Sequence, residues 1–174
     1  SDDGRYAATA GFDRQVVVVD LEQQQEAARL TGHTRGVLAA VVRPRQLESP
    51  DSRPPGPPLL VTAGADHTLR VWNVAEKKLV RTLENHSAAV ADLSLRPQPD
   101  GKSNLPMVAS VGADGTARFW QPTIGRLARF ARLASPPTAC CWSPEGSRLE
   151  ACCRNAMAVA ERFIEALNHC DADA

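Results

Sequence analysis

The chain contains 174 residues, which is enough for one domain or for part of a larger one. Its 20 basic and 20 acidic residues cancel, so no excess positive charge faces a phosphate backbone and no nucleic-acid partner is expected. No apolar run approaches the roughly 20 residues that a membrane helix needs, and the first five residues do not resemble a signal peptide. We therefore expect no membrane partner, and the cellular compartment stays open.

Along the chain, one pattern occurs three times around an aspartate. A threonine or serine stands four residues before each aspartate and a glycine stands two residues before it. A tryptophan follows the second and third aspartates by six residues. The three sets are Thr9, Gly11, Asp13 and Val19; Thr62, Gly64, Asp66 and Trp72; and Ser110, Gly112, Asp114 and Trp120. His33 and His86 precede the second and third sets and are themselves 53 residues apart. The sequence therefore contains an internal repeat.

Each repeat predicts four short strands, because runs rich in valine and leucine alternate with polar or Gly/Pro turns. The strands expected in the second repeat cover 36–43, 59–63, 68–74 and 79–84, and those in the third cover 88–96, 106–110, 115–121 and 126–132. The glycine ahead of each aspartate is expected to adopt the positive φ of a tight hairpin turn. Four-stranded units of this length cannot bury both sheet faces alone, and stacking against further copies solves that problem.

The histidine, the aspartate in the second turn and the tryptophan that ends the third strand resemble WD-repeat β-propellers. The resemblance covers residues 1 to about 150 and implies an all-β fold of four-stranded antiparallel blades in an incomplete arc. We expect units at about 1–31, 32–84, 85–133 and 134–153, as part of a larger propeller. The resemblance also implies one hydrogen-bonded tetrad per blade: His33, Thr62, Asp66 and Trp72 in the second unit, and His86, Ser110, Asp114 and Trp120 in the third.

The outer units depart from this pattern. The first has Val19 in place of the tryptophan and no histidine upstream, so its tetrad cannot be complete. The fourth has Pro136 in place of the histidine, and no aspartate follows it. Residues 154–174 are expected to form a short C-terminal helix or a divergent tail, because Met157, Ile164 and Leu167 fall at helical spacing. A degenerate pair of strands is the alternative.

Two other features of the sequence are interpreted as structural and not functional. The proline-rich segments 43–58 and 97–106 are expected to be irregular loops on the face opposite the histidine and aspartate loops, with partner binding as the alternative. The cysteines, at 140–141, 152–153 and 170, are expected to be small buried side chains, with a disulfide between the two pairs as the alternative. Their spacing does not fit a zinc site.

His86, Ser110 and Asp114 have the composition of a hydrolase triad. The same set recurs in the preceding repeat with a tryptophan beside it, and catalytic sites are not duplicated in this way. We expect no catalytic residue, no cofactor and no metal. The loops that carry Arg35, Ala65, His67 and Ala113 are expected to face one end of the propeller without a large aromatic anchor.

These expectations define a non-enzymatic scaffold for a protein or peptide partner. The alternative is an accessory module of an enzyme whose catalytic domain lies outside this chain. The open sheet edges are expected to meet further blades of the parent propeller or to drive self-association.

Overall fold

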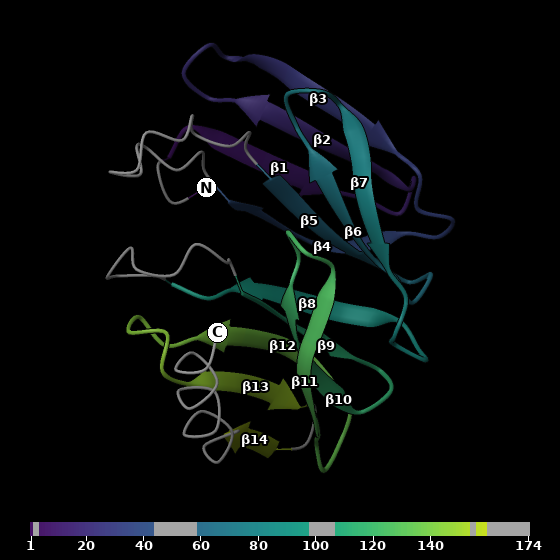
Figure 1. The fold of residues 1–174 in the computed structure, drawn as a ribbon, viewed down its shortest axis with the longest axis vertical. Helices are drawn as coiled ribbons and strands as arrows, with labels where there is room; N and C mark the ends of the chain where they lie inside the picture. Colours follow the sequence, from purple (N-terminus) through teal and green to yellow (C-terminus); the bar gives the residue numbers. More distant parts are fainter. Residues whose placement is uncertain (2–3, 44–58, 98–106, 154–155, 160–174) are drawn as a thin grey trace. The chain divides into compact units, whose positions relative to one another are not determined.

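A computed structural model describes residues 1, 4–43, 59–97, 107–153 and 156–159 of the chain. All fourteen regular elements in these ranges are β-strands, arranged in four antiparallel sheets (Figure 1). None of the elements in these ranges is a helix with the length and apolarity needed to cross a membrane. The chain divides into two units, residues 1–90 and 91–174.

The first unit contains two sheets. The first sheet has the order β1-β2-β3 and the second has the order β4-β5-β6-β7. Their strands are β1 (Tyr6–Ala10), β2 (Gln15–Asp20), β3 (Gln25–Thr31), β4 (Val37–Arg43), β5 (Leu59–Gly64), β6 (Leu69–Asn73) and β7 (Lys78–Leu83).

The second unit contains the other two sheets, in the orders β11-β10-β9-β8 and β12-β13-β14. Their strands are β8 (Val90–Leu95), whose first residue closes the first unit, β9 (Val108–Gly112), β10 (Thr116–Gln121), β11 (Arg126–Arg132), β12 (Pro137–Trp142), β13 (Leu149–Cys153) and β14 (Ala156–Val159). The eight strands expected in the second and third repeats are present to within two residues at each end. The all-β fold of four-stranded antiparallel sheets is therefore confirmed.

The expected C-terminal helix is wrong where the structure describes it. Strand β14 occupies 156–159 and pairs antiparallel with β13, with Ala156 opposite Cys153 and Val159 opposite Glu150. Helical spacing is a local signal, whereas β13 offers an unpaired edge that a following segment can pair with. Residues 160–174 lie outside the described residues, as do 44–58 and 98–106 of the two proline-rich segments.

In each unit the core lies between its two sheets. On β2 every second residue is buried, and Val16 and Val18 pack with Leu60 and Trp72 of the second sheet. In the second unit, Phe119 contributes to a cluster with Trp142 and Leu149, and the Phe119 and Trp142 rings are 5.7 Å apart. Alternating burial therefore explains how valine-rich strands hold two sheets together.

Polar contacts also join the two sheets of the second unit. The Cys140 N–H donates to Asp92 Oδ2 at 2.8 Å, and the Trp142 N–H donates to Ser94 Oγ at 3.2 Å. Asp92 and Ser94 lie two apart on β8, and Cys140 and Trp142 lie two apart on β12. Side chains of one edge strand thus satisfy backbone donors on the edge of the next sheet.

The repeat is also visible in the backbone. The register shifts after Val18 in β2, Val71 in β6 and Phe119 in β10, where the partner strand has one extra residue (Ala27, Val80 and Ala128), so this bulge is present even where Val19 replaces the tryptophan. The positive φ of the preceding turn falls on Arg14 (67°), His67 (69°) and Gly115 (71°). The expectation that the glycine ahead of the aspartate takes this conformation is wrong, because the residue after the aspartate takes it.

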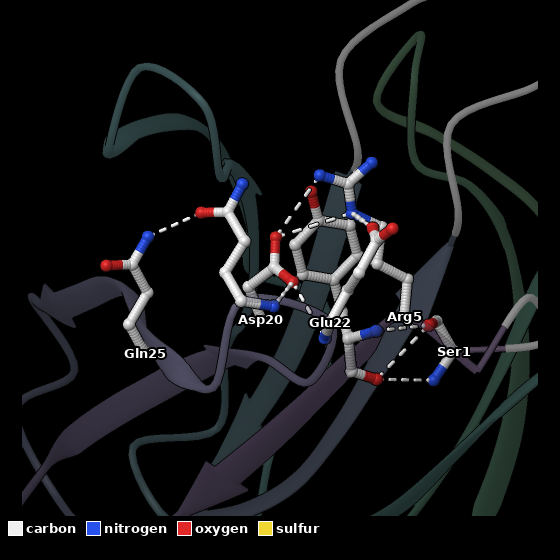
Figure 2. Close-up of polar contacts among 7 residues, drawn as sticks. Ser1, Arg5, Asp20, Glu22 and Gln25 are labelled. Atoms are coloured by element: carbon white, nitrogen blue, oxygen red, sulfur yellow. Dashed lines mark hydrogen bonds and ion pairs between the residues drawn. The ribbon is translucent and has the colours of Figure 1, made fainter.

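Asp20 closes the hairpin between β2 and β3. Its Oδ1 accepts the N–H groups of Glu22 and Gln23 at 3.0 Å each, and its Oδ2 lies 3.2 Å from Nη2 of Arg5 (Figure 2). The backbone N–H of Gln23 and, to a smaller extent, the Arg5 guanidinium lower the pKa of Asp20 against the effect of burial. Asn73 holds the same place in the second repeat, where its Oδ1 accepts the Glu76 N–H at 3.2 Å.

Candidate functional site

The second repeat brings His33, Thr62, Asp66 and Trp72 into one chain of hydrogen bonds. Trp72 Nε1 donates to Thr62 Oγ1 at 2.9 Å, and Thr62 Oγ1 lies 2.8 Å from His33 Nε2. His33 Nδ1 lies 2.9 Å from Asp66 Oδ2. Thr62 and Trp72 are buried on adjacent strands β5 and β6, while His33 and Asp66 come from the loops ahead of β4 and β6. We call this set of four residues the clasp.

The partners in the clasp fix the direction of each proton. The Asp66 carboxylate only accepts, so His33 Nδ1 carries the hydrogen, and its Nε2 then accepts from the Thr62 hydroxyl. The Thr62 oxygen in turn accepts from the Trp72 indole. This order requires a neutral imidazole. Burial lowers the pKa of His33, and that effect exceeds the opposing effect of its hydrogen bond to Asp66.

Asp66 links the clasp to the surrounding backbone. Its Oδ2 accepts the Thr34 N–H at 2.9 Å, and its Oδ1 accepts the Thr68 hydroxyl at 2.9 Å. Burial opposes ionisation of this carboxyl most strongly, but the donors Thr34, His33 and Thr68 together outweigh it and lower its pKa to about 2. The carboxylate therefore connects the loop ahead of β4 to the turn between β5 and β6.

Gly64 is required by space around the clasp. A Cβ atom at this residue would lie 2.6 Å from Asp66 Oδ1 and 2.7 Å from His33 Nδ1, which is inside van der Waals contact. Gly11, at the same place in the first repeat, would bring a Cβ to 2.7 Å from Asp13 Oδ1. These glycines allow the aspartate side chain to fold back over the turn.

The third repeat shows part of the same arrangement inside the second unit. Trp120 Nε1 donates to Ser110 Oγ at 2.8 Å, and both residues are buried. Asp114 Oδ1 accepts the Thr116 hydroxyl at 2.7 Å. His86 is also buried, and it belongs to the first unit.

The first repeat has the same strand register without the clasp. Thr9 pairs with Val17 as Thr62 pairs with Arg70, but Thr9 is exposed. Asp13 is exposed as well, and its Oδ1 accepts the Gln15 N–H at 3.1 Å. The strand pairing of the repeat therefore forms without the buried hydrogen-bonded side chains that make up the clasp in the second repeat.

The turns beside the clasp meet at one place in the first unit. The Val37 N–H donates to Gly11 O at 3.0 Å, and the Ala65 N–H donates to Gly36 O at 2.8 Å. The turns 11–14 and 64–67 therefore both contact the loop 33–36. We call these three segments the loop cluster.

Of the four residues expected to face a partner, three lie in the loop cluster. Arg35 is exposed, and Ala65 and His67 are half-buried, while Ala113 is exposed on the equivalent turn of the second unit. The sequence reading missed Phe12, which holds the place of Ala65 and Ala113 in the first repeat and is 87% exposed. Aligning the three turns by their aspartates finds it. The turn of the first repeat is not among the loops expected to face a partner, and it adds a large aromatic side chain to the loop cluster.

The four described cysteines are free thiols. Cys140 and Cys153 are buried, and Cys141 and Cys152 are exposed, because neighbouring strand residues point to opposite faces. The expectation of buried side chains is confirmed for Cys140 and Cys153 and is wrong for Cys141 and Cys152, and the alternative of a disulfide between the two pairs is wrong for these four residues. Cys170 lies outside the described residues.

Comparison with known proteins gives the same picture. The family profile described as "WD domain, G-beta repeat" matches residues 24–73 and 77–121, which together are more than half of the chain. The chain is 35% identical over 92 residues to pre-mRNA-processing factor 19 of Bos taurus, covering 53% of this chain and 16% of that protein. It is 33% identical over 122 residues to nuclear distribution protein PAC1 of Arthroderma otae, covering 70% and 24%.

A third relative, p21-activated protein kinase-interacting protein 1-like of Gallus gallus, is 24% identical over 144 residues, covering 83% of this chain and 34% of that protein. The chain thus spans less than a fifth of the length of pre-mRNA-processing factor 19 and about a third of this third relative. With two matched repeats and the strand pattern described above, the chain belongs to the WD40 repeat family.

Proposed function

We propose that this chain is a non-enzymatic scaffold that binds a protein or peptide partner through the loop cluster. Membership of the WD40 repeat family supports a role in protein–protein interaction. The observation that carries the proposal is the clasp, which bonds the loop ahead of β4 to strands β5 and β6 through buried side chains. A surface held in this way loses little conformational freedom when a partner binds.

The clasp residues support a structural role for themselves. Thr62 and Ser110 have no exposed surface, and each hydroxyl oxygen already accepts an indole N–H. A nucleophile must reach its substrate and needs a base that is not otherwise engaged. We infer that His33, Thr62, Asp66 and Trp72 hold the blade together, and that Ser110, Asp114 and Trp120 have the same role within the second unit.

The chain is further proposed to be part of a larger propeller, with units at about 1–31, 32–84, 85–133 and 134–153. The first and fourth sheets have three strands among the described residues, whereas the second and third have four. The small share of the relatives' length that the chain covers supports the same proposal. Further blades of the parent protein, or a second copy, would cover the open edges.

The alternative is an accessory module of an enzyme whose catalytic domain lies elsewhere in the parent protein. Both functions use the loop cluster for binding. They differ in whether the parent protein also carries a catalytic domain. The full-length parent sequence distinguishes them directly, because a catalytic domain beside the repeats would favour the alternative.

A binding experiment tests the scaffold proposal. Proteins captured from an extract by the wild-type chain are compared with those captured by a Phe12→Ser/Arg35→Ala variant and by a Glu22→Gln control. Glu22 is exposed at the hairpin between β2 and β3, outside the loop cluster. We expect the loop variant to lose partners that the control retains. Identical capture by all three proteins would contradict the proposal.

A further inference from the structure

The hairpin formed by β10 and β11 has an unusual charge. Between residues 115 and 144 the sequence contains four arginines, Arg118, Arg126, Arg129 and Arg132, and no aspartate or glutamate. The chain as a whole has equal numbers of acidic and basic residues. Arg118 Nη2 lies 3.7 Å from Asp114 Oδ2, so the excess positive charge lies on β11, in an otherwise balanced protein.

Strand β11 is also the edge of its sheet. The order β11-β10-β9-β8 places it at one end, and it pairs with β10 along one side from Arg126 to Arg132. No other described strand pairs with its second side. Such an edge presents a row of backbone donors and acceptors to any segment that can adopt an extended conformation.

The equivalent edge strands of the other repeats differ in charge. Arg126, Arg129 and Arg132 lie opposite Gln121, Phe119 and Thr116 in the strand register. The corresponding residues are Lys78, Arg81 and Glu84 in the second repeat, and Gln25, Ala28 and Thr31 in the first. On β3 the one arginine, Arg29, pairs with Glu26 at 2.6 Å. At these three places β11 thus carries three cations, whereas the second repeat carries two cations and Glu84, and the first carries no charge.

Two of the β11 arginines have no acidic partner. Arg126 and Arg132 are exposed, and neither forms an ion pair with a described carboxylate. Between them lies Phe130, which is 52% exposed and has the Arg118 guanidinium 5.7 Å from its ring centroid. The edge therefore combines free backbone groups, unpaired cations and one aromatic side chain.

We propose that β11 binds an extended acidic segment of a partner protein, which adds to the sheet as a fifth strand beside β11. Backbone hydrogen bonds would supply affinity, and carboxylates opposite Arg126 and Arg132 would supply specificity. Phe130 provides an apolar contact between the two cations. A nucleic acid could match the charge but not the backbone edge, so the edge favours a peptide.

The same arginines explain why β11 does not select a second copy of itself. Two β11 strands side by side would place arginines close to arginines, and like charges across a strand pair are destabilising. An acidic strand relieves that repulsion and gains opposite-charge pairs. The charge pattern thus disfavours pairing with a second β11 strand and favours an acidic partner segment. The proposal adds a second surface to the proposed scaffold function and does not depend on the loop cluster.

The experiment uses a fluorescein-labelled peptide of alternating glutamate and threonine, matched to the seven residues of β11. Its affinity for the full 174-residue chain is measured by fluorescence anisotropy at low and high salt. A second peptide carries N-methyl groups on alternate amides, which preserves its charge but removes the donors that pair with a strand. A single-stranded DNA of the same charge is the third probe.

We expect the unmodified peptide to bind, with affinity that falls as salt rises, and the N-methylated peptide and the DNA to bind at least about tenfold more weakly. An Arg126→Gln/Arg132→Gln variant should weaken peptide binding by about tenfold, while a Lys78→Gln/Arg81→Gln control on β7 should leave it unchanged. Circular dichroism melting of both variants checks that they fold.

Three results would overturn the proposal: no binding of the acidic peptide by the folded wild-type chain, equal binding of the N-methylated peptide or the DNA, or equal loss in the β7 control. Loss of binding to loop-cluster partners in the Phe12→Ser/Arg35→Ala variant would not affect this result, so the two proposals fail independently.

Discussion

The indole of Trp72 and the hydroxyl of Thr62 are joined across β5 and β6 by a 2.9 Å hydrogen bond, in which Trp72 Nε1 donates to Thr62 Oγ1. The same Thr62 oxygen lies 2.8 Å from His33 Nε2, so one buried hydroxyl connects two aromatic side chains from different segments. Trp120 and Ser110 repeat the first of these contacts at 2.8 Å. Removal of the Thr62 hydroxyl oxygen should therefore destabilise the first unit.

Replacing Thr62 by valine preserves the shape of the side chain and removes this oxygen. Two buried polar groups, Trp72 Nε1 and His33 Nε2, then lose their partner, so we expect the free energy of unfolding to fall by about 2–4 kcal/mol. Urea denaturation measures the change. Thr9→Val is the matched control, because Thr9 has the same register place, is exposed and should change stability by less than about 0.5 kcal/mol. Equal effects of the two substitutions would contradict a structural role for the clasp.

Acid should weaken the clasp in two stages. The pKa of His33 is lowered from its ordinary 6.5, mainly by burial, so the unfolded chain takes up a proton more readily as the pH falls below 6.5. The pKa of Asp66 is lowered from 3.8 to about 2, so the stability that it contributes is present above 3.8 and is lost as the pH falls toward 2. Both groups make stability decrease with acid.

Denaturation midpoints between pH 7 and about pH 2 measure this dependence. A His33→Asn variant should be less stable at pH 7 and should show a flatter dependence between pH 6.5 and pH 5, because the titrating group is absent. If wild-type stability instead rises as the pH falls through 6.5, His33 is charged in the folded chain and the proton order assigned to the clasp is wrong.

Gly64→Ala should destabilise the chain through overpacking. The added methyl group would lie 2.6 Å from Asp66 Oδ1 and 2.7 Å from His33 Nδ1, two atoms held in place by their mutual hydrogen bonds. We expect a loss of about 2–3 kcal/mol, measured by thermal or urea denaturation.

Gly115→Ala is the control for this glycine. Its added Cβ meets no atom within 4 Å, and its φ of +71° should cost only about 1 kcal/mol. A smaller loss for Gly64→Ala than for Gly115→Ala would show that backbone conformation, and not crowding by the clasp, explains the glycine ahead of the aspartate.

Thiol modification should separate the adjacent cysteines of each pair. Cys141 and Cys152 are exposed, whereas Cys140 and Cys153 are buried, and burial together with the Asp92 charge raises the pKa of the Cys140 thiol. We expect iodoacetamide to alkylate Cys141 and Cys152 first in the native chain, and all four after denaturation. Peptide mass spectrometry of a Cys170→Ser variant measures the order. Similar native rates for Cys140 and Cys141 would contradict the orientation of β12.

Much of the fold could be predicted because its signals are local. Strands β4 to β11 follow from short apolar runs between turns, and the clasp residues could be nominated because they recur at fixed offsets from Asp66. What failed needed information from elsewhere in the chain. Strand β14 forms because β13 lies beside it, and the contact between Cys140 and Asp92 joins strands from different sheets.

The turn glycines show a subtler limit. Sequence reasoning assigned a positive φ to Gly64, but the φ of +69° belongs to His67, one of the few non-glycine residue types that are enriched at positive φ. Gly64 is needed instead because the side chains of Asp66 and His33 come too close for a Cβ. The repeat pattern indicates that a glycine is required at this place. The structure shows that the reason is crowding around its Cβ position and not a positive φ.

The bulge before Val19 has a consequence for how such repeats diverge. Because the pairing of β2 with β3 shifts register at the same place as that of β6 with β7 and of β10 with β11, and does so without an indole beside it, this backbone feature does not depend on the tryptophan. A repeat can therefore lose the residues that identify it in sequence while it keeps the strand register of its neighbours. Degenerate copies of this unit in other chains should be easier to detect by structure comparison than by sequence comparison.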